Sequence, residues 1–413
     1  MADARILLRE LFDAAVAVAS PANCMGRWLP ERPAGHILAV GAGKAAAGMA
    51  YELEKAWQGP LTGLVIVPYG HASDCQSIEV IEAAHPEPDA AGVAAATRIL
   101  EMVSGLSADD TVVCLISGGG SSLLCLPIAG VTLAEKRNIT SQLLRSGAAI
   151  NEINCVRKKL SAIKGGKLAA ACAPARVVTL IISDVPGNDI SMVASGPTVS
   201  DASPASEALD ILDRYAINVS DTARQSIRNS RPVTIAASDV RILASSDDAL
   251  IASAALAEER DITPYVLGDL SGDARRLANE HAELALQIAA GHGPLSPPCV
   301  ILSGGETTVN VCGDGRGGRN GEYALALAIA LDGHPAIHAI ACDTDGIDGT
   351  GDNAGCFVTP DVLERAANAG VDAKMMLERN DSYGFFDATL DLIVTGPTRT
   401  NVNDFRALLI SAT

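Results

Sequence analysis

Hydrophobic and polar residues follow one another in blocks along this chain of 413 residues. Short runs of β-branched and apolar residues are separated by longer stretches rich in Ala and Leu. Such blocks predict buried strands that alternate with helices, which is typical of α/β layers with mostly parallel strands. The predicted strands cover residues 37–40, 64–68, 78–83, 111–117, 177–183, 241–244, 264–267, 299–303, 337–342 and 391–395.

The first twenty residues predict an amphipathic helix, because apolar side chains such as Leu8, Leu11 and Phe12 recur at helical spacing. Glu10 and Asp13 interrupt the segment and argue against a secretory signal. No apolar run approaches the roughly 20 residues that a membrane span requires. We therefore expect a cytoplasmic protein.

Length and charge narrow the class further. A chain of this length exceeds one compact core, and a polar stretch near residues 228–242 indicates two domains, 1–237 and 238–413. The net charge of −18 argues against nucleic acid or an anionic membrane as the partner.

The ten cysteines are scattered without a C-x-x-C pair, which argues against structural zinc and a disulfide framework.

The stretch "HILAVGAGKAAAGMA" poses the first chemical question. Gly41-x-Gly43-x-x-Ala46 matches the turn that cradles a dinucleotide pyrophosphate. However, the second predicted strand ends in residues 69–71, Tyr-Gly-His, without the acid that would hold a ribose. Lys44 begins a predicted helix, where a cation could neutralise a phosphoryl group or an anionic substrate. The alternative for Lys44 is an exposed lysine in a first helical turn.

"CLISGGGSSLL" is the sharpest local signal for anion binding. A buried strand ends at Ser117, three glycines follow, and Ser121 and Ser122 precede an apolar run. Consecutive glycines allow backbone N–H groups to converge on a phosphate, and the start of a helix adds partial positive charge. The alternative is a tight turn with a serine cap.

Charged residues also gather after later predicted strands. Residues 303–331 place Glu306 and Arg319 around a glycine-rich loop that opens a long helix, where an arginine could meet a phosphate. Residues 342–355 hold several aspartates, and such oxygen-rich clusters suit Mg²⁺. Asp184 and Asp189 are further candidates for metal binding or for a base.

Residues 154–169, "NCVRKKLSAIKGGKLA", concentrate five cations in an acidic protein. Arg157 and Lys164 share a helical face with Ser161. The default expectation for this segment is a solvated helix face. Glycine loops for phosphate, carboxylates for Mg²⁺ and a Lys/Arg pair together form the inventory that phosphoryl transfer needs.

In its ordered motifs the chain resembles the class II glycerate 2-kinases, a family also named hydroxypyruvate reductases of the tartrate-degradation type. The resemblance rests on ordered motifs over residues 5–410, among them "GAGKAAAGM", "SGGGSSLL", "NCVRKKLSAIKGGKLA", "GRGGRNGEYALALA", "DTDGIDG" and "TGPTRTNVND". It implies a Rossmann-like N-terminal α/β domain with a mostly parallel sheet and a C-terminal α/β domain of the MOFRL type. It also implies an active site in the cleft between them. The implied reaction is phosphorylation of D-glycerate to 2-phospho-D-glycerate by ATP, with a divalent cation such as Mg²⁺.

The resemblance also implies roles for individual residues. The family's active-site lysine and arginine fall on Lys44 and Arg319, for transition-state charge or the glycerate carboxylate, and Asp184 is a further catalytic candidate for the hydroxyl proton. The predicted substrate and phosphate contacts are Gly43, Ser117, Gly118, Gly119, Gly120, Ser121, Ser122, Glu306, Asn320 and Thr398. The predicted metal ligands are Asp189, Asp343, Asp345 and Asp348, although any of these could instead take the hydroxyl proton. Arg399 departs from the family motif, where glycine is more common.

Three other functions stay open. An NAD(P)H-dependent hydroxypyruvate reductase would use the Gly41–Ala46 turn for its cofactor. A small-molecule sensor would use the same pocket, although the chain carries no appended signalling module. A kinase for a related hydroxy acid such as tartronate is the third. We expect small-molecule partners and no nucleic acid or membrane, with a homo-oligomer as an option.

Overall fold

The computed structural model describes residues 2–235 and 239–412. By contact the chain divides into an N-terminal unit, Pro21–Leu243, and a C-terminal unit, Met1–Ser20 with Ala244–Thr413. The predicted boundary at residues 237 and 238 lies outside the described residues. By contact, helix α1 (Ala2–Ala19) belongs to the C-terminal unit, where the Ser253 hydroxyl donates to the Leu11 carbonyl at 2.8 Å.

The N-terminal unit is built on a sheet with the strand order β3-β2-β1-β4-β5-β6. The pairs β2–β3, β1–β2, β1–β4 and β4–β5 are parallel, which confirms the predicted parallel sheet. The central strands β1 and β4 are buried along their whole length, as expected where helices cover both faces of a sheet. The strands are β1 (Ile37–Ala42), β2 (Leu61–Pro68), β3 (Ile78–Ala83), β4 (Thr111–Ser117), β5 (Arg176–Ile182) and β6 (Asp239–Ala244).

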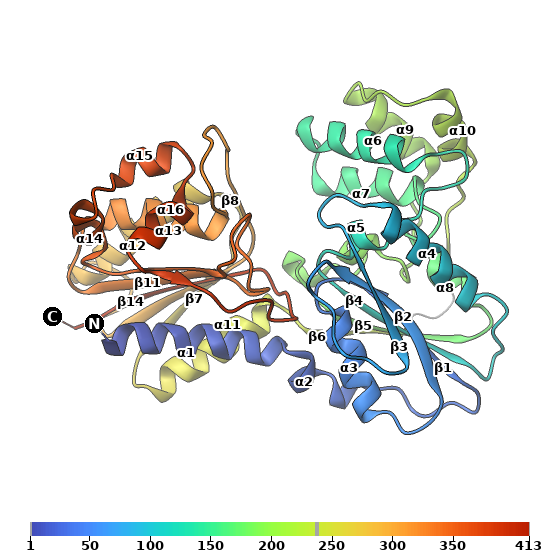
Figure 1. Cartoon of the computed structure of the whole chain (residues 1–413), viewed down its shortest axis with the longest axis horizontal. Helices are drawn as coiled ribbons and strands as arrows, with labels where there is room; N and C mark the ends of the chain where they lie inside the picture. The colour runs from blue at the N-terminus through green and yellow to red at the C-terminus, as the bar shows by residue number, and fades with distance from the viewer. Residues whose placement is uncertain (1, 236–238, 413) are drawn as a thin grey trace. The chain divides into compact units, whose positions relative to one another are not determined.

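Helices of the N-terminal unit form two groups (Figure 1). The first group packs on the sheet and contains α3 (Ala46–Ala56), α4 (Ala90–Val103), α5 (Gly120–Leu123) and α8 (Lys167–Ala171), and the short helix α2 (Pro21–Cys24) contacts α3. The second group surrounds its own apolar core and contains α6 (Leu133–Arg145), α7 (Ile150–Lys159), α9 (Ala205–Arg214) and α10 (Asp221–Asn229). Short 3₁₀ turns occur at Gly26–Trp28, Pro186–Asn188 and Val193–Ser195.

The C-terminal unit has a second sheet with the order β13-β12-β11-β14-β9-β7. Strands β7 and β9 are parallel, but β9–β14, β14–β11, β11–β12 and β12–β13 are antiparallel. The expectation of mostly parallel strands along the whole chain is therefore wrong for this unit. The strands are β7 (Thr263–Asp269), β9 (Cys299–Gly304), β11 (Ile337–Asp343), β12 (Gly355–Val358), β13 (Leu392–Ile393) and β14 (Asp404–Ile410), with a separate pair β8 (Gly272–Asp273) and β10 (Thr307–Thr308).

Helices cover both faces of this second sheet (Figure 1). One face carries α12 (Ala274–Ala289) and α13 (Arg319–Leu331), and the other carries α1 and α11 (Ser246–Glu259). The smaller helices α14 (Val362–Asn368), α15 (Ala373–Glu378) and α16 (Ser382–Ala388) lie around α13.

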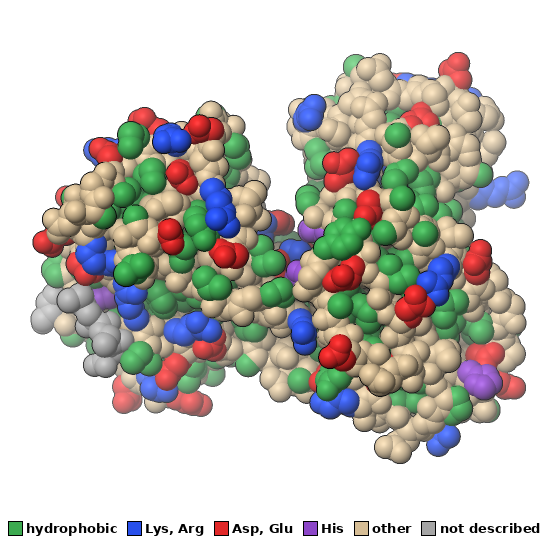
Figure 2. Space-filling view, in the orientation of Figure 1, with side chains coloured by type: hydrophobic (Ala, Val, Ile, Leu, Met, Phe, Trp, Pro, Cys, Tyr) green, Lys and Arg blue, Asp and Glu red, His purple; other side chains and the backbone are tan. Residues whose placement is uncertain are grey.

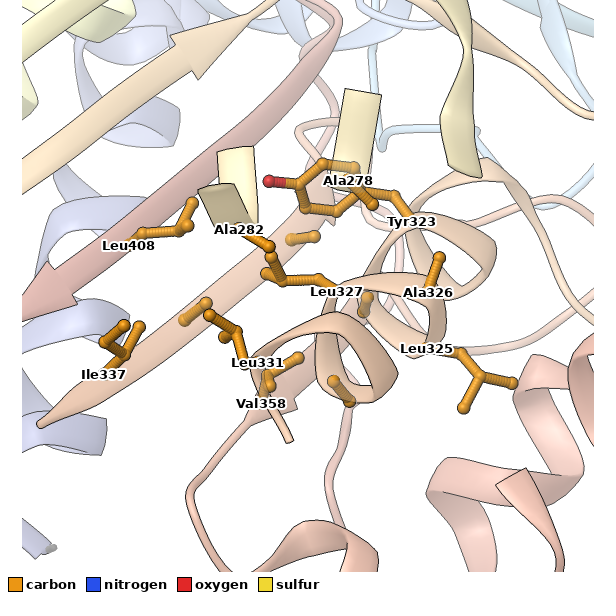
Figure 3. Close-up of a cluster of buried hydrophobic side chains, with 14 of the residues drawn as sticks. Ala278, Ala282, Tyr323, Leu325, Ala326, Leu327, Leu331, Ile337, Val358 and Leu408 are labelled. Atoms are coloured by element: carbon orange, nitrogen blue, oxygen red, sulfur yellow. The ribbon is translucent and has the colours of Figure 1, made fainter. Parts of the chain in front are cut away.

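Helix α13 is fixed by its apolar side chains. Figure 3 shows side chains of α12 and α13 meeting those of the sheet, among them Ala278, Ala282, Tyr323, Leu327, Leu331, Ile337, Val358 and Leu408. Each fully buried leucine of this kind contributes about 1.5–3 kcal/mol relative to an exposed one. The start of α13, which carries Arg319, is thereby held at a defined place beside β11 and β14.

The surface carries charges of both signs. On the face drawn in Figure 2, Lys and Arg side chains are interspersed with Asp and Glu in each unit. Among the described residues, no helix combines the length and the apolar character that crossing a membrane would require.

Candidate functional site

Lys44 lies in the turn between β1 and α3, and this turn is joined to the loop after β4. The Lys44 amide donates to the Gly118 carbonyl at 2.8 Å, and the Ala45 amide donates to Ser117 Oγ at 2.9 Å. Gly43 has φ 139°, and a Cβ there would lie 2.2 Å from Ser117 Oγ. Because only glycine permits this approach, the sequence of the turn determines how closely the two loops meet.

A third loop reaches the same place. Gly119 has φ 80°, and a Cβ on it would lie 3.0 Å from His85 Nε2 and 3.5 Å from Lys44 Cγ. The loops after β1, β3 and β4 therefore converge at the carboxyl ends of parallel strands, where open α/β sheets bind ligands. The structure thus brings together two of the predicted elements, Lys44 and the loop of residues 117–122.

The two serines of that loop have different partners. Ser122 Oγ donates to the Gly119 carbonyl at 3.1 Å, which caps the turn. Ser121 Oγ lies 2.9 Å from Ser195 Oγ, which donates in turn to Asn154 Oδ1 at 3.0 Å. Helix α5 spans only Gly120–Leu123, so the predicted charge contribution of a helix start is limited to a single turn. Anion binding by this loop depends instead on its glycines and on nearby cations.

Asp184 and Asp189 follow β5 in the N-terminal unit. Asp184 is half-buried and lies just beyond the carboxyl end of the strand, as the sequence predicts. Asp189 is exposed, and its carboxylate accepts the Ser191 amide at 2.9 Å.

Arg319, in the C-terminal unit, is held by three carboxylates. Its Nε donates to Asp404 at 2.8 Å, Nη2 donates to Asp343 at 2.9 Å, and Nη1 donates to Glu306. Asp343 and Asp404 are register partners on β11 and β14, which places both side chains on the same face of the sheet. Burial alone would lower the pKa of Arg319, but the three carboxylates outweigh burial and raise the pKa.

Asp404 is shared between two arginines and an amide. Its Oδ2 accepts from Arg406 at 2.5 Å, and its Oδ1 accepts from Arg319 and from Asn320 Nδ2, the latter at 2.8 Å. Arg406 is fully buried, donates to the Gly304 carbonyl at 2.8 Å and lies over the Tyr323 ring. Such a network fixes the position of Arg319, because no member can move without leaving a buried charge unpaired.

Asp348, predicted as a metal ligand, lies beside the start of α13. Its two oxygens accept the amides of Asn320 at 3.0 Å and Gly321 at 2.8 Å, at the start of α13. Burial raises the pKa of Asp348 to about 6. This carboxylate therefore caps the helix that carries Arg319.

The rest of the acidic loop is held by its own backbone. Asp343 accepts the Asp345 amide at 3.1 Å, and Asp345 accepts the Ile347 amide at 2.8 Å. Thr398 donates to the Thr344 carbonyl at 2.5 Å, and its amide donates to the Asp345 carbonyl at 2.9 Å. Thr398 thus braces this loop.

The predicted aspartates do not form a metal site by themselves. Residues 2–235 and 239–412 contain no group of three or more His, Cys, Asp or Glu side chains that could hold a metal ion. Asp343 pairs with Arg319, and Asp348 caps α13. Metal binding by Asp189, Asp343, Asp345 and Asp348 stays a prediction.

Sequence reasoning missed some features of these sites. The cationic segment 154–169 is not a solvated face, because Lys159 and Lys164 are each only 1% exposed. The run of five cations beside two glycines could have indicated that these lysines are buried. No local sequence pattern indicates the burial of Lys136 or of Asp404.

Comparison with known proteins places the chain among α/β enzymes of two domains. Residues 7–258 match the family described as "Domain of unknown function (DUF4147)", and residues 299–404 match the MOFRL family. The chain therefore belongs to the DUF4147 family, with a MOFRL domain following.

Individual relatives cover nearly the whole chain. A protein of Agrobacterium vitis named "Putative hydroxypyruvate reductase" is 50% identical over 98% of this chain and 94% of its own length. D-glycerate 2-kinase of Thermotoga maritima is 36% identical over 96% of this chain and 95% of its own length. A crystal structure of the Thermotoga maritima glycerate kinase superimposes with a TM-score of 0.91, at 36% identity, and covers 99% of this chain and 100% of that one.

Proposed function

We propose that this protein is a glycerate 2-kinase, which transfers the γ-phosphoryl group of ATP to the C2 hydroxyl of D-glycerate. One observation carries the proposal: Lys44 is fixed against the glycine loop of residues 117–122 at the carboxyl end of a parallel sheet. The likeness to D-glycerate 2-kinase of Thermotoga maritima over nearly the full length of both chains supports it.

In the proposed reaction, the C2 oxygen forms a bond to the γ-phosphorus while the bond from that phosphorus to the ADP oxygen breaks. Catalysis of this step consists mostly of positioning and of stabilising charge on the transferred group. Backbone amides of residues 118–120 would contact phosphate oxygens, and Lys44 would neutralise charge on the phosphoryl group or on the glycerate carboxylate. Asp184 is the proposed acceptor of the hydroxyl proton.

Arg319 would take part by exchanging one of its partners. Asp343 and Asp404 are buried and hold the guanidinium in place, whereas the Glu306 side chain is 57% exposed. An anionic substrate can therefore displace Glu306 while the other two contacts persist. Arg319 would then supply positive charge without losing its orientation.

The second candidate is an NAD(P)H-dependent hydroxypyruvate reductase. The Agrobacterium vitis relative is named "Putative hydroxypyruvate reductase". The Gly41–Ala46 turn favours it. However, strand β2 ends at Pro68, and the three residues that follow it, Tyr69, Gly70 and His71, include no acid that could hold a ribose. The kinase therefore explains the residues better. A cytoplasmic location and a homo-oligomer stay predictions.

ADP release is expected to require a divalent cation, because kinases bind nucleotide phosphates together with Mg²⁺. An excess of EDTA over metal should abolish ADP release in the presence of D-glycerate and ATP, and added Mg²⁺ should restore it. EDTA already saturated with Mg²⁺ is the control and should have no effect. ADP release that persists at full rate in metal-free buffer with EDTA would contradict the proposed use of a metal–nucleotide complex.

A further inference from the structure

Three cations of the N-terminal unit lie near enough to one another for Lys136 and Arg157 to act on Lys164, and for Arg157 to act on Lys136. Lys136 of α6 is 4% exposed, Lys164 after α7 is 1% exposed, and Arg157 of α7 is half-buried. Within the described residues, no salt bridge joins any of the three to an acid. Lys159, on the same helix as Arg157, shows the contrast, because its Nζ lies 2.8 Å from Asp201 Oδ2.

The partners that these cations do have are weak. Lys164 Nζ donates to the Ala194 carbonyl at 3.1 Å. Lys136 Nζ has no hydrogen bond to an oxygen or nitrogen of the described residues, and only the Cys125 thiol favours its charge. Burial lowers the pKa of Lys164, of Lys136 and of Arg157. The charges of Lys136 and Arg157 lower the pKa of Lys164 further, and the charge of Arg157 lowers that of Lys136, where Cys125 acts in the opposite direction.

An uncompensated buried charge is costly, so a protein that keeps two buried lysines beside a half-buried arginine generally gains something from them. A bound anion would supply the missing opposite charge and would accept hydrogen bonds from all three groups. Arg157 is only half-buried, so part of this residue is accessible to solvent.

Neutral polar groups adjoin the cations on the side of the glycine loop. Asn154 lies one turn before Arg157 on α7 and accepts from Ser195 Oγ, which contacts Ser121 Oγ of the loop. Ala194, whose carbonyl receives Lys164, packs against Gly120, where an added Cβ would lie 2.8 Å from the Ala194 side chain. The cations therefore lie immediately behind the loop of residues 117–122.

We propose that Lys136, Arg157 and Lys164 form a binding site for a small oxyanion, either a carboxylate of a hydroxy acid or a phosphoryl group. Ser121 and Asn154 lie on the same side and are the neutral groups available to this anion. This site would add an anion-binding group of residues to the proposed kinase. Only the identity of the natural anion, glycerate or a nucleotide phosphate, rests on the proposed function.

Inorganic phosphate is the first probe, used with the full chain in a buffer without other multivalent anions. Phosphate should raise the Tm of the wild-type protein by several degrees, because a ligand that binds the folded state stabilises it. Lys136→Met and Arg157→Gln should each weaken phosphate binding by at least ~10-fold, as loss of a charged hydrogen-bond donor commonly does. In phosphate-free buffer, Lys136→Met should leave Tm unchanged or raise it, because an unpaired buried charge is removed.

Two neighbouring lysines serve as matched controls. Lys158→Met removes a half-buried cation of the same helix and should leave the phosphate response intact. Lys159→Met should lower Tm, since it leaves buried Asp201 unpaired, and the variant should still respond to phosphate. If both Lys136→Met and Arg157→Gln respond to phosphate as the wild type does, the proposed site is wrong. Should Lys136→Met fail to fold, Arg157→Gln alone decides the question.

Calorimetric titrations then distinguish the two sources of the anion. Loss of D-glycerate binding with intact ADP binding in the two variants would assign the site to a carboxylate, and the reverse result would assign it to a phosphoryl group. These titrations require no turnover. A wild-type protein that binds phosphate through these residues but releases no ADP would therefore disprove the kinase proposal and leave the anion site standing.

Discussion

Replacing Lys44 with alanine should lower kcat for phosphorylation of D-glycerate by at least ~10²-fold, as loss of one charge-stabilising group in an active site commonly does. The structure fixes the backbone of Lys44 against Gly118 and the start of its side chain beside Gly119, so the ammonium group is carried by a rigid turn. The measurement is ADP release at saturating ATP and D-glycerate, with circular dichroism to verify the fold.

Lys55→Ala is the matched control for this prediction. Lys55 lies in the last turn of α3, the helix that follows Lys44, is exposed, and pairs with Glu52 at 3.1 Å. Because exposed pairs of this kind contribute little, its kcat should stay within about twofold of the wild type. Wild-type turnover by Lys44→Ala would remove Lys44 from the proposed mechanism.

Replacing Arg319 with alanine should have two effects at once. We expect kcat to fall by at least ~10²-fold for the same electrostatic reason. We also expect the free energy of unfolding to fall by roughly 3 kcal/mol or more, because buried Asp343 and Asp404 each lose a cationic partner. Kinetic assays and denaturant unfolding measure the two effects separately.

The controls for Arg319 are chosen from its own surroundings. Arg316, three residues earlier, is exposed and stacks on Tyr383 at 3.8 Å, so Arg316→Ala should change neither quantity much. Arg319→Lys keeps the charge but cannot contact three carboxylates in the same geometry, and it should recover stability more than kcat. An Arg319→Ala variant that is destabilised yet turns over normally would show a structural role alone.

Much of the fold could be predicted from hydrophobic patterning, because the buried strands of the first sheet are nearly uninterrupted apolar runs. The prediction of β3 and β4 agrees with the structure residue for residue. Strand β14 was not predicted, since Arg406 interrupts its apolar run and is buried only because Asp404 compensates it. The antiparallel pairing of the second sheet depends on long-range contacts that local patterns do not carry.

The sequence indicated which residues belong to the candidate site better than it indicated which side chains those residues contact. Both Lys44 and the loop of residues 117–122 follow strands, and parallel strands bring such loops together. Which carboxylates hold Arg319 depends on the register of β11 and β14, which cannot be read from local sequence. The aspartates predicted for Mg²⁺ were judged by composition alone, so their use by Arg319 and by the start of α13 was not foreseen.

The measurement that tests the central claim most directly is product analysis with purified protein, ATP, Mg²⁺ and D-glycerate, beside parallel reactions of hydroxypyruvate with NADH or NADPH. The kinase proposal predicts ADP release that requires D-glycerate, and a product that enolase consumes because the phosphate is on C2. Oxidation of NADH or NADPH by hydroxypyruvate, without ADP release from the glycerate reaction, would contradict it and would assign the Gly41–Ala46 turn to a dinucleotide.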